Sequence, residues 1–124
     1  MKLSVLQYSI TITRLSPEQE VPQWGWENKT FLSVTYTTDE LSIVCPSSSV
    51  PADVQCKRGW IAIKVQGPLD FSLTGILAAL ARPLAADGIP IFALSTFDTD
   101  YVLVKEEQLP QAREVLERAG HTFE

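Results

Sequence analysis

The sequence predicts an α+β fold of two units, each with an antiparallel sheet and helices on one face, the N-terminal unit being degenerate. Three observations lead to this prediction. The second half of the chain reads as strand, helix, strand, strand, helix. The first half repeats the strand–turn–strand part of that order, at a shift that places position 44 on position 104. The 124 residues, 45% hydrophobic and 20% charged, suffice for one compact domain or two small halves that share a core.

The first elements of the second half follow from apolar periodicity. Residues 60–65 (WIAIKV) alternate in polarity, which is typical of a strand. A helix is predicted over Asp70–Asp87, with Asp70 or Ser72 as its cap and Gly88 just beyond its end. Its apolar face, at helical spacing, consists of Leu73, Ile76, Leu77, Leu80 and Leu84.

A hairpin and a second helix complete this half. Ile89–Val104 reads as two strands joined by a polar turn at residues 95–100. Pro110–Ala119 is predicted to be helical, because proline suits the first turn and Gly120 ends the pattern. Helices on one side of an antiparallel sheet are typical of a ferredoxin-like fold. Residues 121–124 are too few to supply its closing strand well.

The first half is predicted to be a degenerate copy of the second. A constant shift places the hairpin at residues 31–45 on the later hairpin, with Val44 on Val104. Residues 16–30 stand where the helix of this copy would be. They contain two prolines and two tryptophans, so one short helix is the most that they can form.

Composition and charge argue against several classes of function. A net charge of -5 suits non-specific nucleic-acid binding poorly, because that binding needs clustered Lys and Arg. No apolar run is long enough to span a membrane, and no secretion signal is visible, so the expected location is cytoplasmic. Two cysteines and one histidine fall short of the four ligands of a usual zinc site. Without a phosphate loop or a paired nucleophile and base, neither catalysis nor a cofactor is expected.

Three stretches carry a family resemblance: residues 40–46 (ELSIVCP), 67–77 (GPLDFSLTGIL) and 95–104 (STFDTDYVLV). Together they resemble the small bacterial proteins built from tandem ACT domains, of a subtype similar to that of the CASTOR arginine sensors. The resemblance implies a degenerate ACT-like unit at residues 1–58 and an ACT domain at residues 59–124. It also implies a regulatory homodimer that binds a free amino acid at an interface between ACT units.

The same resemblance places the candidate ligand-binding residues in two segments. The first opens a helix, where backbone N–H groups and the helix dipole favour a carboxylate. The second is the polar turn, in which Asp100, with Asp98 in reserve, can accept hydrogen bonds from an ammonium group. The full set is Leu69, Asp70, Phe71, Ser72, Leu73, Thr74, Gly75, Ser95, Thr96, Phe97, Asp98 and Asp100.

Each of these features has a plainer interpretation. Asp70 and Ser72 are also ordinary helix caps, and Asp98 and Asp100 are ordinary turn residues. Phe97 could equally be a core residue or the apolar contact of a dimer. The alternative function is therefore a protein–protein interaction scaffold that binds no small ligand. An RNA-binding module on the same topology ranks lower, because it needs stacking aromatics and basic charge.

Overall fold

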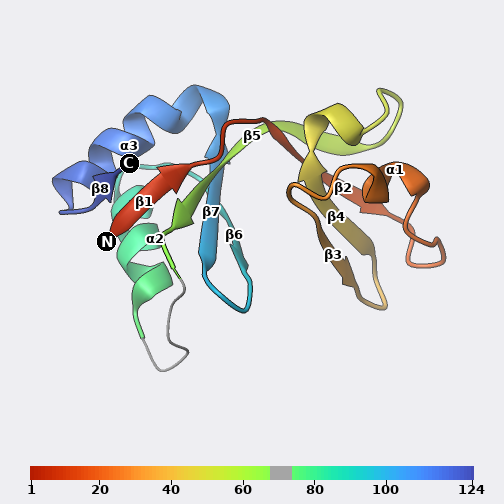
Figure 1. Cartoon of the computed structure of the whole chain (residues 1–124), viewed down its shortest axis with the longest axis horizontal. Coiled ribbons are helices and arrows are strands. Elements are labelled where there is room, and N and C mark those ends of the chain that lie inside the picture. The colour runs from red at the N-terminus through yellow and green to blue at the C-terminus, as the bar shows by residue number, and fades with distance from the viewer. Residues whose placement is uncertain (68–73) are drawn as a thin grey trace. The chain divides into compact units, whose positions relative to one another are not determined.

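The computed structural model describes residues 1–67 and 74–124 (Figure 1). It confirms a mixed α+β architecture and divides into two compact units: unit 1, residues 1–7 and 61–124, and unit 2, residues 8–60. In chain order the elements are β1 (Lys2–Val5), β2 (Ile10–Leu15), α1 (Gln23–Glu27), β3 (Ser33–Tyr36), β4 (Leu41–Pro46), the 3₁₀ turn η1 (Ser47–Ser49), β5 (Cys56–Val65), α2 (Ile76–Ala86), β6 (Phe92–Ser95), β7 (Asp100–Lys105), the 3₁₀ turn η2 (Glu106–Gln108), α3 (Leu109–Arg118) and β8 (Thr122–Phe123).

The sheet of unit 1 has the strand order β8-β1-β5-β7-β6. The N-terminal strand β1 lies antiparallel to β5, with Leu3 opposite Val65, and β8 pairs with β1 in parallel. Residues 121–124 are too few to form the closing strand next to β5. The N-terminal strand β1 takes that position instead. For this reason residues 1–7 belong with unit 1, whereas the predicted division after residue 58 grouped them with the first half.

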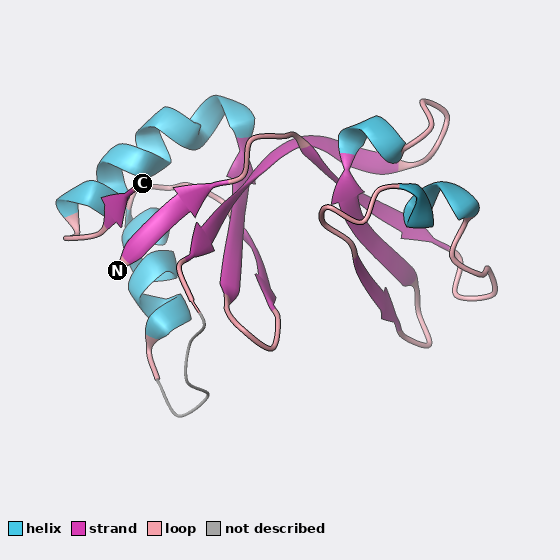
Figure 2. Cartoon of the chain, in the orientation of Figure 1, coloured by secondary structure: helices cyan, strands magenta, loops and turns pink. Residues whose placement is uncertain are grey.

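Helices α2 and α3 cover one face of the unit 1 sheet (Figure 2). Leu80 and Leu84 of α2 are fully buried against this face, at the helical spacing that the sequence predicted. The rest of the buried core comes from strands, from α3 and from one loop residue: Leu3, Ile63, Val65, Ile89, Val102, Val104, Ala112, Val115 and Leu116.

Unit 2 is an antiparallel sheet in the order β3-β4-β2-β5. The helix α1 has five residues, which agrees with the short helix expected there. Trp24 packs on the core around Ile43. A Cβ on Gly25 would lie 3.1 Å from Cγ1 of Val21, so the small residue lets α1 lie close to its neighbours.

Helix α2 begins later than predicted. Its N-cap is Gly75, in the left-handed conformation at φ 76°, and its first residue is Ile76 rather than Asp70. A right-handed helix cannot continue through a residue with that φ, which explains the later start. The expected caps Asp70 and Ser72 lie outside the described residues. The end agrees with the prediction, since α2 stops at Ala86, before the turn at Gly88.

The two hairpins match in a register that differs from the predicted one by a single position. Tyr36 pairs with Leu41 in unit 2, and Ser95 pairs with Asp100 in unit 1, so Tyr36 corresponds to Ser95 and Leu41 to Asp100. The turns η1 and η2, which begin at residues 47 and 106, keep the same correspondence. It places Val44 on Leu103, so the predicted superposition of Val44 on Val104 is wrong. Runs of consecutive buried residues surround both positions, so apolarity alone could not fix the register.

Candidate functional site

The polar turn of the candidate site is the tip of the β6–β7 hairpin. The amide of Thr96 donates a hydrogen bond to the Thr99 carbonyl at 2.8 Å and closes the turn. The Thr96 hydroxyl also donates to that carbonyl, at 3.2 Å. Phe97 and Asp98 lie between them and are exposed, Phe97 by 81% of its surface, so Phe97 is not a core residue of this chain.

The hydroxyl and the carboxylate at the base of the turn are already paired. Ser95 and Asp100 face each other across β6 and β7, and Ser95 Oγ donates to Asp100 Oδ1 at 2.5 Å. Asp100 is half-buried, whereas Asp98 is exposed. A carboxylate that is held in place loses less side-chain entropy when it binds a cation. The geometry therefore favours Asp100 over Asp98 as the acidic residue.

Thr99 fixes this turn to the rest of unit 1. Its side chain is buried, and Oγ1 donates to the Val65 carbonyl at 2.6 Å. Val65 is the last residue of β5, so the bond holds the turn beside the point where the chain leaves β5 towards α2. The sequence interpretation passed over Thr99. Thr99 stands within the polar turn, and its polarity alone does not separate it from the other turn residues.

The helix-opening segment is described only at its end. Leu69, Asp70, Phe71, Ser72 and Leu73 lie outside the described residues. Thr74 and Gly75 are exposed, and the Gly75 carbonyl accepts the Ala79 amide at 2.9 Å as the first helical bond of α2. The first backbone N–H groups of a helix have no partner within it, so the start of α2 provides donors for an anion.

Replacing Gly75 by valine should destabilise the protein by about 1–2 kcal/mol. An L residue in the left-handed region costs about this much, and a β-branched one suits it least. The space around Gly75 is open, so the cost comes from the backbone and not from a steric clash. Urea unfolding would measure it. Gly75→Asn is the control, because asparagine tolerates this conformation, and equal losses for both variants would contradict the explanation.

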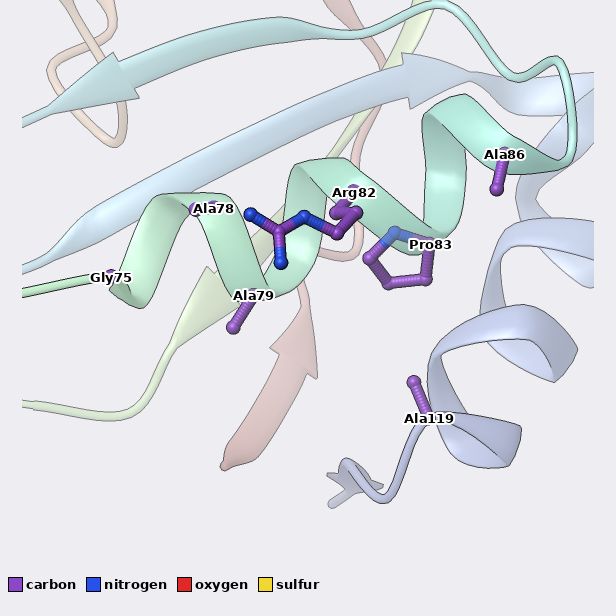
Figure 3. Close-up of a pocket in the computed structure, with 7 residues that line it drawn as sticks. All are labelled: Gly75, Ala78, Ala79, Arg82, Pro83, Ala86 and Ala119. Carbon is purple, nitrogen blue, oxygen red and sulfur yellow. The ribbon is translucent and has the colours of Figure 1, made fainter.

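Gly75 also opens a groove along the outer face of α2 (Figure 3). The groove has a volume of about 490 Å³ and is lined by Gly75, Ala78, Ala79, Arg82, Pro83, Ala86 and Ala119. None of the turn residues 95–100 belongs to this lining. Among the described candidates, the structure joins Ser95 and Asp100 directly, and Gly75 lines the groove on α2.

Two other kinds of chemistry, a cysteine nucleophile and a bound metal ion, can be assessed from the described residues. Burial raises the pKa of the Cys45 thiol to about 11, so the nucleophilic thiolate is scarce near neutral pH. Within residues 1–67 and 74–124, no three His, Cys, Asp or Glu side chains are grouped as metal ligands would be. Across the same residues, no helix is both long and apolar enough to cross a membrane.

The comparison with protein families decides the assignment. The family model for the ACT domain matches residues 55–118, more than half of the chain. The chain belongs to the ACT domain family. A second model, for an N-terminal domain, matches residues 7–53 of this ACT protein.

A crystal structure from Agobacterium tumefaciens resembles this ACT protein along nearly its whole length. It is 42% identical with a TM-score of 0.92, and the match covers 99% of this chain and 91% of that one. The structure of aspartokinase alpha and beta subunits is 18% identical with a TM-score of 0.63, over 96% of this chain and 97% of that one. This second likeness concerns the fold alone.

Curated relatives include an arginine sensor. The human (Homo sapiens) cytosolic arginine sensor for mTORC1 subunit 1 is 42% identical over 60 residues. That match spans 48% of this ACT protein but only 18% of the sensor's length. The similarity therefore concerns a small part of the larger protein.

Proposed function

We propose that this ACT protein is a regulatory module that senses a free amino acid at an interface between ACT units. The observation that carries the proposal is the Ser95–Asp100 pair, held beside the end of β5 by the buried Thr99 bond. A fixed carboxylate near the end of β5, together with the N–H donors at the start of α2, offers partners for both charges of an amino acid. The similarity to an arginine sensor supports the same ligand class.

The roles of the two segments follow from charge. The start of α2, with Gly75 as its cap, would hold the ligand carboxylate through backbone N–H groups. Asp100 would accept hydrogen bonds from the ammonium group or from a cationic side chain, with Asp98 as the reserve candidate. Nothing in this scheme forms or breaks a covalent bond, so the protein is proposed to regulate and not to catalyse.

The second part of the proposal is a cytoplasmic homodimer. Among the described strands, β6 is at one edge of the unit 1 sheet, and β3 is at an edge of the unit 2 sheet. Edge strands carry backbone groups without strand partners, and proteins manage such edges by pairing or covering them. Association about a two-fold axis is the expected arrangement, and it would bring ACT units of two chains together at an interface.

An interaction scaffold without a small ligand is the second candidate. The observations that favour it are the exposed Phe97 and the groove along α2, whose lining is small and apolar apart from Arg82. Exposed apolar surface of this kind often marks a site where another protein binds.

Native mass spectrometry separates the two candidates. The protein would be purified without denaturation and incubated with a mixture of the twenty standard amino acids. The sensor proposal predicts a dimer that carries the mass of an amino acid. A dimer with no bound small molecule would support the scaffold, and a monomer at high micromolar concentration would contradict the dimer.

A further inference from the structure

The tips of the β3–β4 and β6–β7 hairpins, which Figure 1 labels, share one pattern of hydrogen bonds. The Thr96 amide donates to the Thr99 carbonyl at 2.8 Å in unit 1, and the Thr37 amide donates to the Glu40 carbonyl at 2.9 Å in unit 2. In each turn the threonine hydroxyl accepts a bond from the amide three residues on, at 3.3 Å and 3.1 Å respectively. Thr37 and Thr96 are therefore equivalent, and the side chains around the two tips can be compared directly.

The pair that forms the polar base of the turn in unit 1 has no charged counterpart in unit 2. Ser95 and Asp100 correspond to Tyr36 and Leu41. Leu41 is fully buried in the core of unit 2. Unit 2 therefore offers no carboxylate where unit 1 holds Asp100, and an ammonium group would find no ionic partner at this position.

The tip in unit 2 is also tied to its own chain. The Tyr36 hydroxyl donates to the Gln19 carbonyl at 2.7 Å. Gln19 lies between β2 and α1, in the connection that corresponds to the one between β5 and α2 in unit 1. Nearby, Arg14 Nη2 donates to the Asp39 carbonyl at 3.0 Å. Two side chains of unit 2 therefore bond backbone carbonyls at the hairpin tip and in the connection between β2 and α1.

We propose that each chain contributes a single amino-acid site, formed on unit 1, and that Tyr36 closes the equivalent place in unit 2. The ligand half of this inference rests on the proposed function. The closure half rests only on the contacts of unit 2. The degenerate unit then binds no amino acid of its own, and the number of ligands equals the number of chains.

Hydrogen exchange tests the closure without any ligand. Tyr36→Phe removes the hydroxyl that holds Gln19 and keeps the ring. Loss of one such bond should make the amides of residues 18–21 exchange about two- to tenfold faster. Thr35→Ala, at an exposed neighbouring position of β3, is the matched control and should leave them unchanged. Equal exchange rates in wild type and Tyr36→Phe would overturn the closure.

Calorimetry tests the number of sites, with each of the twenty standard amino acids as the titrant in turn. One ligand per chain is expected. Ser95→Tyr, which copies the unit 2 residue into unit 1, should abolish binding, whereas Ser95→Ala should only weaken it. Two ligands per chain, or undiminished binding by Ser95→Tyr, would overturn the inference. If no amino acid binds, the proposed function and the single site fail together, while the exchange rates still decide the closure.

Discussion

Replacing Asp100 by alanine should weaken amino-acid binding about ten- to a hundredfold, because a charge-assisted hydrogen bond contributes about 1.5–3 kcal/mol. Asp100 is the half-buried carboxylate that Ser95 holds at 2.5 Å, so its geometry is set before the ligand arrives. Asp100→Asn removes the charge but keeps an oxygen that can accept the Ser95 bond. A loss of similar size in that variant would assign the effect to charge and not to the position of the side chain.

Two comparisons make the Asp100 result specific. Asp98→Ala removes the exposed acid two residues earlier and should have a smaller effect. Glu107→Ala removes an exposed acid from η2 and should have none. If Asp100→Ala binds as tightly as wild type while Asp98→Ala does not, the reserve candidate takes the role. If both bind normally, the site is elsewhere and the sensor function stands.

Replacing Leu3 by alanine should lower the free energy of unfolding by about 2–5 kcal/mol, the usual cost of removing a buried leucine side chain. Leu3 is fully buried in the core of unit 1, although it lies near the start of the chain. Because β1 lies between β5 and β8, a loosened β1 would also weaken the pairing of both neighbours. Denaturant unfolding would measure the loss.

Lys2→Ala is the matched control for Leu3→Ala, since Lys2 is exposed on the same strand. It should change the free energy of unfolding by less than about 0.5 kcal/mol. Hydrogen exchange should show that Leu3→Ala raises exchange in residues 61–65 and 122–124 and leaves residues 33–46 unchanged. A small loss for Leu3→Ala, or one spread evenly over both units, would contradict the place of β1 in unit 1.

The local sequence pattern predicted the helices and strands of the second half better than the order of the strands in the sheet. Helix α3 and the β6–β7 hairpin agree with the prediction because each is specified by nearby residues, such as Pro110 and the turn at residues 95–100. Which strand lies beside β5 depends on a long-range pairing, of Leu3 with Val65, that has no local signal. The start of α2 was also missed, because a glycine inside an apolar pattern does not reveal its φ.

The candidate site was predictable only where its contacts join residues that are close in sequence. Ser95 and Asp100 stand close together in sequence around a turn, so their pairing follows from the hairpin itself. The Thr99 hydroxyl donates to the carbonyl of Val65, which is distant in sequence. The polarity of Thr99 alone could not distinguish it from an ordinary turn residue. Residues 69–73 of the candidate set remain a prediction, because they lie outside the described part of the chain.

Isothermal titration calorimetry of the wild-type protein against each of the twenty standard amino acids, at millimolar concentration, tests the sensor function most directly. A saturable signal for at least one amino acid, weakened in Asp100→Asn, is the predicted result. Absence of heat for all twenty, from a protein that is folded by circular dichroism, would contradict the sensor function and leave the interaction scaffold in its place.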